Sequence, residues 1–472
     1  MARTFFEKVW NDHVVTEIDS DTSLLYIDRI FLHELTGASA MRQLENGSRR
    51  PRRSDSVFVT IDHVIDTAPG RTKNQSVASL GSAMIQETTE AARRYGFTLF
   101  DADDRRQGIV HVISPDLGIA LPGVTLVCGD SHTSTVGGVG AIGFGIGSTD
   151  CEQILASQTL ALKRPRAMRI WVTGILQNGV YPKDLILDLI RNIGANGGLG
   201  FAVEFAGPAI AAMSVEGRLT LCNMATEFGA KFGFVAPDEQ TFNYLVGRNY
   251  APHGRAWDEA VEYWKSLTTD TDATFDREVS IDCACLEPQI TWGTSPQHVV
   301  GVASKVPEIE EISPDQRSSA LRALDYMHLK PGQQLEGLPV DAAYIGACTN
   351  ARLADLQAAG SVLRGRRVHP SVLAICVPGS REVKEKAEAE GLHAVFKSAG
   401  FEWHEAGCGL CGHMGNDRLK GLRVVSTTNR NFVGRQGPGT MTHLASPVTV
   451  AASAILGGIA DIRKMENAGS AL

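Results

Sequence analysis

The sequence of 472 residues contains no apolar run of the roughly 18 residues that a membrane-spanning helix requires. Its first residues also lack the apolar stretch of a secretory signal peptide, so we expect a cytoplasmic protein that does not associate with membranes. An excess of basic residues is missing too, because the formal net charge is −8. This balance argues against nucleic acid as a partner, and the single basic run at residues 49–53 is predicted to be a solvated loop.

Nine cysteines are present, and their number is odd and their spacing irregular. A disulfide framework is not expected in a long cytosolic chain, because that compartment is reducing. A subset of the cysteines that binds metal is the better interpretation. Cys128, Cys151, Cys222 and Cys376 lie in apolar surroundings and are predicted to be core residues.

Alternating strand and helix patterns predict an α/β fold. Short apolar runs at 124–128, 342–345 and 372–377 indicate buried strands of partly parallel sheets. Amphipathic stretches predict helices between them, at Ile85–Tyr95, Glu152–Lys163, Asp258–Leu267 and Arg381–Glu390. The length suggests about three domains. Polar stretches and composition place the expected units at 1–165, 166–280 and 281–472.

Residues 138–143 fit the GxGxxG pattern of dinucleotide-binding proteins. That pattern requires a strand immediately before it and an acidic residue about 20 positions later. Here it follows the polar stretch 131–135 and continues as Phe-Gly-Ile-Gly-Ser. We therefore interpret it as a glycine-rich turn that leads into a helix, and not as a cofactor site.

Three cysteines stand in positions suited to ligands. Cys348 follows the apolar run 342–345 directly, where open α/β sheets place their ligands, and Cys408 and Cys411 form a CxxC among glycines. A structural zinc site would need a fourth ligand, which His413 could supply. A redox-active CxxC is a second possibility, and an iron–sulfur cluster held by three thiolates is a third. The spacing alone leaves all three open.

The order of several motifs resembles the aconitase superfamily over essentially the whole chain. These motifs are Asp62-His63, Gly108 to His111, Asp130-Ser131-His132, Val203-Glu204, Cys348-Thr349-Asn350, Cys408 to Cys411, and Asn429-Arg430 to Arg435. Within the superfamily, three further stretches are similar to the large subunits of bacterial 3-isopropylmalate dehydratases. They are Leu24 to Arg29, Glu216 to Met224, and Val235 to Tyr244.

The resemblance implies three α/β/α domains around a central iron–sulfur cluster, without the fourth, swivelling domain of the superfamily. It implies one 4Fe–4S cluster with Cys348, Cys408 and Cys411 as ligands and one iron left open. It further implies a hydro-lyase that isomerises 2-isopropylmalate to 3-isopropylmalate through 2-isopropylmaleate, a step of leucine biosynthesis. An open iron would act as a Lewis acid on the substrate hydroxyl.

The resemblance also assigns roles to the remaining polar residues. A carboxylate beside an imidazole orients the ring and raises its basicity, as acid–base catalysis requires. Asp62, His63, His111, Asp130, His132 and Glu204 are the expected catalytic residues. Arginine matches a carboxylate with two hydrogen bonds. Ser131, Asn350, Asn429, Arg430 and Arg435 are the expected substrate-binding residues of a small dicarboxylate.

The base that removes the carbon proton is absent from this set. In the superfamily it is a serine on the swivelling domain, which the resemblance implies is a separate small subunit. Ser380 lies in a similar Pro-Gly-Ser-Arg stretch, but it stands between a predicted strand and a predicted helix. We interpret Ser380 as a helix N-cap, with Arg381 near enough to approach the site, and expect the isolated chain to be nearly inactive.

Two other functions remain possible at this stage. Departures from the leucine-pathway pattern occur at 64–66, 103–106 and 409–414. They leave open a related hydratase of citraconate, 2-methylmalate or another substituted maleate, since a methylene or two is worth only about 1–3 kcal/mol of discrimination each. An RNA-binding regulator of aconitase type is the alternative of another class, and the acidic balance disfavours it.

Overall fold

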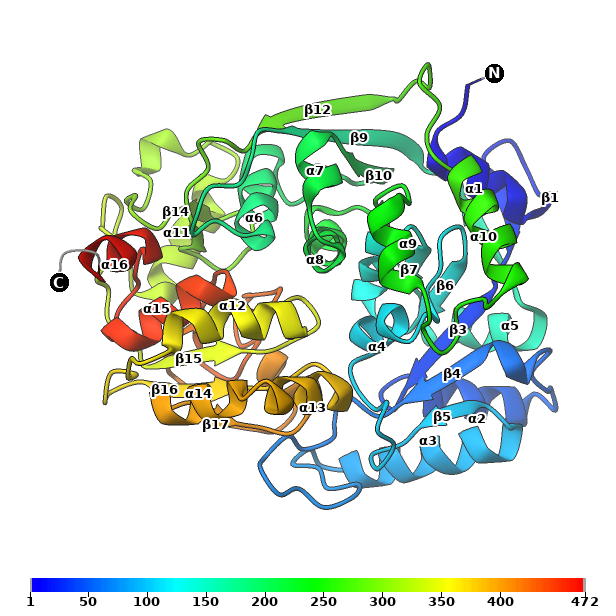
Figure 1. Ribbon diagram of the computed structural model, residues 1–472, viewed down its shortest axis with the longest axis horizontal. Coiled ribbons are helices and arrows are strands. Elements are labelled where there is room, and N and C mark those ends of the chain that lie inside the picture. The colour runs from blue at the N-terminus through cyan, green and yellow to red at the C-terminus, as the bar shows by residue number, and fades with distance from the viewer. Residues whose placement is uncertain (1, 470–472) are drawn as a thin grey trace.

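Parallel sheets form the framework of the chain, of which the computed structural model describes residues 2–469 (Figure 1). The N-terminal sheet has the strand order β5-β4-β3-β6-β7, and all its neighbours are parallel. Its strands are β3 (Arg29–His33), β4 (Val57–Thr60), β5 (Thr98–Phe100), β6 (Thr125–Cys128) and β7 (Ile142–Gly145). A three-stranded antiparallel sheet, β1-β2-β8, accompanies it. Its strands are β1 (Val14–Glu17), β2 (Thr22–Tyr26) and β8 (Thr159–Lys163).

Two further parallel sheets follow along the chain. The middle sheet has the order β11-β10-β9-β12 and the C-terminal sheet the order β17-β16-β15-β18-β19. The middle strands are β9 (Arg166–Thr173), β10 (Phe201–Ala206), β11 (Phe232–Phe234) and β12 (Arg277–Asp282). The C-terminal strands are β15 (Ala342–Ile345), β16 (Leu373–Cys376), β17 (Glu402–Trp403), β18 (Arg423–Ser426) and β19 (Met441–Leu444). An antiparallel pair, β13 (Gln289–Thr291) and β14 (Val299–Gly301), lies between them in sequence.

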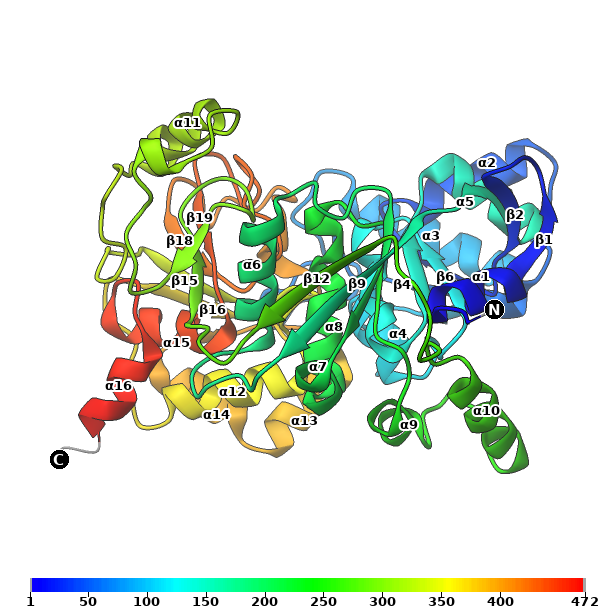
Figure 2. The ribbon, with the colours of Figure 1, turned by 90° about the horizontal axis from the view of Figure 1, so that it is seen from above.

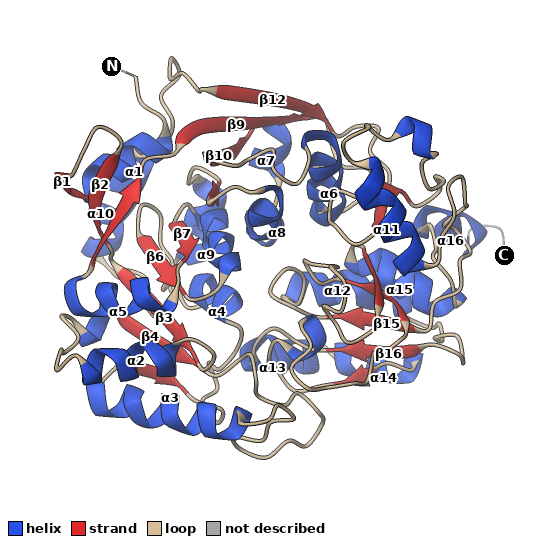
Figure 3. Cartoon of the chain, turned by 180° about the vertical axis from the view of Figure 1, so that it is seen from behind, coloured by secondary structure: helices blue, strands red, loops and turns tan. Residues whose placement is uncertain are grey.

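Helices cover these sheets, as Figures 2 and 3 show. Those of the first half are α1 (Phe5–His13), α2 (Gly37–Asn46), α3 (Gly81–Tyr95), α4 (Val110–Asp116), α5 (Ser148–Ser157), α6 (Pro182–Ile193), α7 (Pro208–Ala212) and α8 (Val215–Met224). Those of the second half are α9 (Glu239–Leu245), α10 (Arg255–Ser266), α11 (Arg317–Met327), α12 (Leu353–Leu363), α13 (Arg381–Ala389), α14 (Leu392–Ala399), α15 (Pro447–Leu456) and α16 (Ile462–Gly469). None of the helices in residues 2–469 is long and apolar enough to cross a membrane.

Most expected elements form where the sequence patterns predicted them. The apolar runs at 124–128 and 342–345 contain β6 and β15, whose residues are all buried, as strands covered on both faces require. Ser380 is the N-cap of α13, because its Oγ accepts a hydrogen bond from the backbone N–H of Val383 at 3.1 Å. Arg381 donates to the carbonyl of Ala102.

The prediction of a single helix over Glu152–Lys163 is wrong. Helix α5 ends at Ser157, because Gln158 adopts a left-handed conformation with φ +57°. The next five residues form β8, in which Leu160 and Leu162 are buried and Ala161 and Lys163 are exposed. This alternation has the period of two that a strand with one buried face requires.

The glycine-rich stretch 138–143 is not a nucleotide loop. Gly138 lies so close to α8 that a Cβ there would come within 2.6 Å of the Leu219 nitrogen. The stretch ends a 3-10 helix, η2 (Ser131–Val139), and leads into β7 before α5 begins. Its glycines therefore allow close packing between η2, α8 and the N-terminal sheet.

The sheets change near the expected domain boundaries. Strand β8 ends at Lys163 and β9 begins at Arg166, while β12 ends at Asp282. The helices α9 and α10, however, pack on the N-terminal core through Phe242 and Trp264. The units 1–165, 166–280 and 281–472 therefore stay a proposal. Figure 1 shows α8 between the N-terminal and the C-terminal sheets, where the site described next is formed.

Candidate active site

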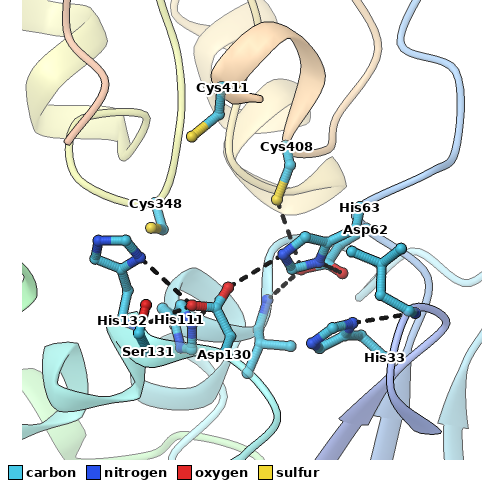
Figure 4. Close-up of polar contacts among 12 residues, drawn as sticks. His33, Asp62, His63, His111, Asp130, Ser131, His132, Cys348, Cys408 and Cys411 are labelled. Atoms are coloured by element: carbon cyan, nitrogen blue, oxygen red, sulfur yellow. Dashed lines mark hydrogen bonds and ion pairs between the residues drawn. The ribbon is translucent and has the colours of Figure 1, made fainter. Parts of the chain in front are cut away.

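Three cysteines from two loops of the C-terminal sheet face one cavity of about 230 Å³. Cys348 follows β15 after Ala347, which has φ +74° and turns the chain. Cys408 and Cys411 border the short 3-10 turn η5 (Gly409–Cys411). Figure 4 shows the three sulfur atoms directed toward the same space, above a group of histidines and aspartates. The structure thus brings together Cys348 and the CxxC, which 59 intervening residues separate in the chain.

The CxxC loop is held in place by a buried tyrosine. The Tyr344 hydroxyl donates to the carbonyl of Cys408 and accepts from the backbone N–H of Leu410, both at 3.1 Å. Gly409 has φ +56°, and a Cβ there would lie 2.8 Å from the Tyr344 oxygen. A glycine is required at this position because the loop passes so close to the ring.

Nitrogen donors surround the buried sulfurs. Asn223 Nδ2 lies 3.1 Å and Asn429 Nδ2 lies 3.4 Å from the Cys348 sulfur, while Arg435 Nη2 lies 3.4 Å from the Cys411 sulfur. Burial raises the pKa of Cys348 to about 12 and that of Cys408 well above its usual range. Buried thiols of this kind become thiolates when a metal replaces the proton, and the donors then stabilise the sulfur charge.

His413 does not complete a tetrahedral site with the cysteines. Its Nε2 lies 2.9 Å from the Asp417 carboxylate, and the residue is not among those that line the cavity. The zinc site of three cysteines and one histidine that the spacing left open is therefore not formed by this residue.

An Asp–His pair lies below the sulfurs. Asp62 is fully buried, and its Oδ1 lies 2.6 Å from His63 Nδ1, while its Oδ2 accepts from the Val110 backbone N–H at 3.0 Å. Burial alone would lower the pKa of His63, but Asp62, the Cys408 sulfur and Asp130 raise it well above its usual range. The ring is thereby oriented and able to hold a proton at neutral pH.

Asp130 is the centre of the histidine group. Its carboxylate oxygens lie 3.1 Å from His63 Nε2, 3.5 Å from His111 Nε2 and 3.4 Å from His132 Nδ1. Burial alone would raise the pKa of Asp130, but His111, His132 and His63 hold it well below the usual range. The loop is positioned by a close approach at Gly129, where a Cβ would come within 2.2 Å of the Thr36 hydroxyl.

A residue that the motifs did not identify completes the network. Glu227 lies in the 3-10 helix η3 (Ala225–Phe228), with its Oε1 2.7 Å from His132 Nε2 and 2.8 Å from Arg430 Nε. Arg430 Nη2 also donates to the Ser131 hydroxyl at 2.9 Å. His132, Glu227, Arg430 and Ser131 thus form one continuous chain of contacts along the cavity wall.

His33 and Asn223 were missed as well. The His33 ring stacks on His63 with 4.2 Å between centroids and lines the cavity. Burial lowers the pKa of His33 to about 4, so the ring is neutral at physiological pH. His33 ends β3 in the stretch Leu32-His33-Glu34, and a histidine at the end of a parallel strand was a signal that could have identified it.

Two expected site residues lie elsewhere. Asn350 does not line the cysteine cavity, because its amide donates to Asp355 at 2.9 Å and to Thr220 at 3.3 Å on the other side of the Cys348 loop. Glu204 is buried in β10, where both carboxylate oxygens accept from the Thr269 hydroxyl, at 2.9 and 2.7 Å. The Val203-Glu204 motif suggested that Glu204 lies at the site. In the structure, the glutamate that contacts His132 is Glu227.

The buried Glu204 carboxylate should make the stability of the fold depend on pH. Burial raises the pKa of Glu204 from 4.5 to about 7. Because the folded pKa is the higher one, this group stabilises the fold fully below about pH 4.5, and the stabilisation is lost as the pH rises to about 7. Between pH 5.5 and 8 the loss amounts to about 2 kcal/mol.

In Glu204→Gln this pH dependence should disappear. The free energy of unfolding of the variant minus that of the wild type should therefore be about 2 kcal/mol larger at pH 8 than at pH 5.5. Urea unfolding of the metal-free chain at the two pH values measures this difference. Turnover should be retained, because the side chain is outside the cavity. The opposite result would be a variant that loses turnover and whose difference in free energy of unfolding from the wild type is the same at both pH values. Glu204 would then belong to the site.

The cavity therefore combines three cysteine sulfurs, carboxylate–imidazole pairs and two arginines, Arg430 and Arg435, at the meeting of parallel sheets. These are the groups that a hydro-lyase acting on a carboxylate substrate requires: metal ligands, proton donors and acceptors, and cations.

Comparisons with known proteins show which family has a similar sequence. The model of the aconitase family (aconitate hydratase) matches residues 7–457. The 3-isopropylmalate dehydratase large subunit 1 of Bradyrhizobium diazoefficiens is 50% identical over 467 residues, which cover 98% of this chain and 97% of that protein. A crystal structure of Thermococcus kodakaraensis aconitase X in its holo-form covers 86% of this chain and 84% of its own, with a TM-score of 0.47 and 12% identity.

The chain therefore belongs to the aconitase family. The recognition made from the motifs, the aconitase-type α/β fold and the assignment as a hydro-lyase are confirmed. The family also implies an iron–sulfur cluster.

Proposed function

We propose that this chain is the large subunit of a 3-isopropylmalate dehydratase, which isomerises 2-isopropylmalate to 3-isopropylmalate through 2-isopropylmaleate in leucine biosynthesis. The observation that carries the proposal is the convergence of three cysteine sulfurs with the Asp62–His63 pair, Asp130 and Arg430 on one cavity. The 50% identity with a relative of that name over nearly the whole chain supports the choice of substrate. A cytoplasmic location stays a prediction.

The cofactor of this proposal is one 4Fe–4S cluster held by Cys348, Cys408 and Cys411. The fit is supported by the buried sulfurs and by the N–H donors of Asn223 and Asn429 directed at Cys348. No fourth cysteine lines the cavity in the described part of the chain, so one iron would lack a protein ligand. When bound, such a cluster supplies a Lewis acid for the substrate hydroxyl.

The histidines supply the protons. His63, with its raised pKa and its Nε2 at Asp130, can hold a proton for the departing hydroxyl. Asp62 fixes the ring by accepting from Nδ1, which leaves Nε2 as the working nitrogen. Asp130 remains a carboxylate throughout, and its oxygens also lie 3.5 Å from His111 Nε2 and 3.4 Å from His132 Nδ1.

The arginines and their neighbours bind the carboxylates of the substrate. Arg430 and Arg435 line the cavity, and Arg430 is aligned by Glu227 and Ser131. A guanidinium group in this setting can accept a carboxylate by two parallel hydrogen bonds. Two such groups in one cavity suit a small dicarboxylate, with Ser131 and Asn429 beside it.

A small subunit is the proposed partner, supplying the swivelling domain and the serine base. Among the described residues, Ser131 is the only serine that lines the cavity, and its hydroxyl already accepts from Arg430. Two apolar side chains close to cavity residues in sequence are exposed, namely Phe432 at 50% and Val433 at 58%. Phe432 and Val433 stand between the two arginines in sequence, so a protein that covers them would also close the cavity.

Anaerobic purification of the chain, alone and together with its small subunit, tests the proposal. The complex should interconvert 2-isopropylmalate, 2-isopropylmaleate and 3-isopropylmalate, whereas the chain alone should retain less than about 1% of that turnover, because it lacks the base. Strong turnover by the isolated chain would refute the need for a partner. A complex that prefers citraconate or 2-methylmalate would overturn the substrate and leave the reaction class in place.

A further inference from the structure

A buried lysine lies behind the cysteine cavity. Lys183 is the second residue of α6 and is fully buried. Its ammonium donates to the backbone carbonyls of Thr427 and Thr428, each at 2.6 Å. Figures 2 and 3 show α6 between the middle and the C-terminal sheets, so this contact joins one sheet layer to a loop of the next.

The loop that Lys183 holds carries site residues. Thr427 and Thr428 follow β18 directly and precede Asn429 and Arg430. Asn429 reaches the sulfurs of Cys348 and Cys411, at 3.4 and 3.9 Å, and Arg430 reaches Glu227 at 2.8 Å. A shift of the two carbonyls would therefore move a contact to the sulfurs and a carboxylate-binding arginine together.

No carboxylate in the described part of the chain forms an ion pair with Lys183. Asp184, its neighbour, accepts instead from the backbone N–H groups of Gln289 and Tyr181, each at 2.8 Å. Burial lowers the pKa of Lys183 to about 7, while Asp355, Asp184, Cys411 and Cys348 oppose this shift. A buried cation without a direct partner is costly unless negative charge nearby compensates it, and cysteine thiolates would supply such charge.

We propose that Lys183 is a positioning residue that holds the Asn429–Arg430 loop by its two carbonyl contacts and balances the negative charge of a cluster bound by Cys348 and Cys411. The inference rests on the proposed function, since it concerns the group held at that site. Removing a positive charge close to a redox centre makes adding an electron less favourable, so the charge has a measurable signature apart from turnover.

The test uses Lys183→Met, which removes the charge and both hydrogen bonds, and Lys183→Gln, which removes the charge and keeps an amide donor. After anaerobic reconstitution of the complex with the small subunit, iron and sulfide content and the midpoint potential of the cluster are measured. Both variants should show a potential lower by about 59 mV, a tenfold change in a one-electron equilibrium. KM for the substrate should rise about tenfold in Lys183→Met and less in Lys183→Gln.

Arg218→Met is the matched control. Arg218 is also fully buried and lies on the neighbouring helix α8, but it donates to Asp238 and to the carbonyl of Met213. This variant should lose stability without a change in potential. An unchanged potential in both Lys183 variants, or an equal shift in Arg218→Met, would overturn the inference. A wild-type complex without iron and sulfide would overturn the proposed cofactor, and this inference with it.

Discussion

Replacing Cys348 by alanine is expected to abolish the cluster and the turnover together. The two remaining thiolates cannot hold the iron that Cys348 would bind. Loss of a residue that only supports a metal ligand lowers metal affinity or activity by roughly 10–100-fold, and loss of the ligand itself should lower them further. We therefore expect iron and sulfide to fall to background and kcat by more than about 100-fold. Metal analysis and visible absorbance of the anaerobic complex measure the first effect, and turnover of 2-isopropylmalate the second.

Cys376→Ala is the control for this experiment. Cys376 ends β16, the strand beside β15 in the same sheet, and is as buried as Cys348, but it does not line the cavity. Its truncation should lower stability by about 1 kcal/mol, as loss of a small buried group does, and leave cluster content unchanged. Turnover that survives Cys348→Ala, or an equal loss of iron in Cys376→Ala, would contradict the assignment of the ligands.

Replacing Asp130 by asparagine is expected to lower kcat by about 10²–10⁴-fold while the cluster is retained. Asp130 is the carboxylate shared by His63, His111 and His132, and the neutral amide would no longer raise the pKa of His63. One substitution therefore disturbs all three rings. Steady-state kinetics over a range of pH measures the effect. Without the Asp130 carboxylate the pKa of His63 falls, so the alkaline limb of turnover, where protonated His63 is lost, should shift to lower pH.

Asp28→Asn separates this effect from a general loss of structure. Asp28 also pairs with a histidine, His13, at 2.7 Å, but it lies just before β3, at the opposite end of that strand from His33, which lines the cavity. Burial would raise the pKa of Asp28, but His13 lowers it, so the variant should lose stability and keep its kcat. If Asp130→Asn loses the cluster, or has no larger effect on kcat than Asp28→Asn, the central role of Asp130 is wrong.

Several residues that the motifs predicted for the site share one place in the fold. The three cysteines, His63, Asp130 and Arg430 were all expected, and the structure places them on one cavity. Each of them lies in a loop that follows a strand of a parallel sheet, so a local pattern marks it. The roles of these residues in catalysis stay a proposal.

Other residues stand in equally clear motifs, but their side chains do not line the cavity. Glu204 and Asn350 stand within motifs, yet the first bonds to Thr269 and the second to Asp355. Glu227 lies in a 3-10 turn with no pattern of its own, and only the packing of α8 against η2 brings it to His132. In the same way, β8 was expected as helix because its pairing with β2 depends on residues 133 or more positions earlier.

By itself, the sequence determined the α/β class, the buried strands, the N-cap at Ser380 and the residue types that carry the chemistry, because these follow from side chains a few positions apart. The tertiary structure decided which of those side chains share a cavity. It turned Glu204 and Asn350 away, added Glu227, His33 and Asn223, and placed Lys183 behind the sulfurs. The reason is physical: the site lies where three sheets meet, and its contacts join residues up to several hundred positions apart.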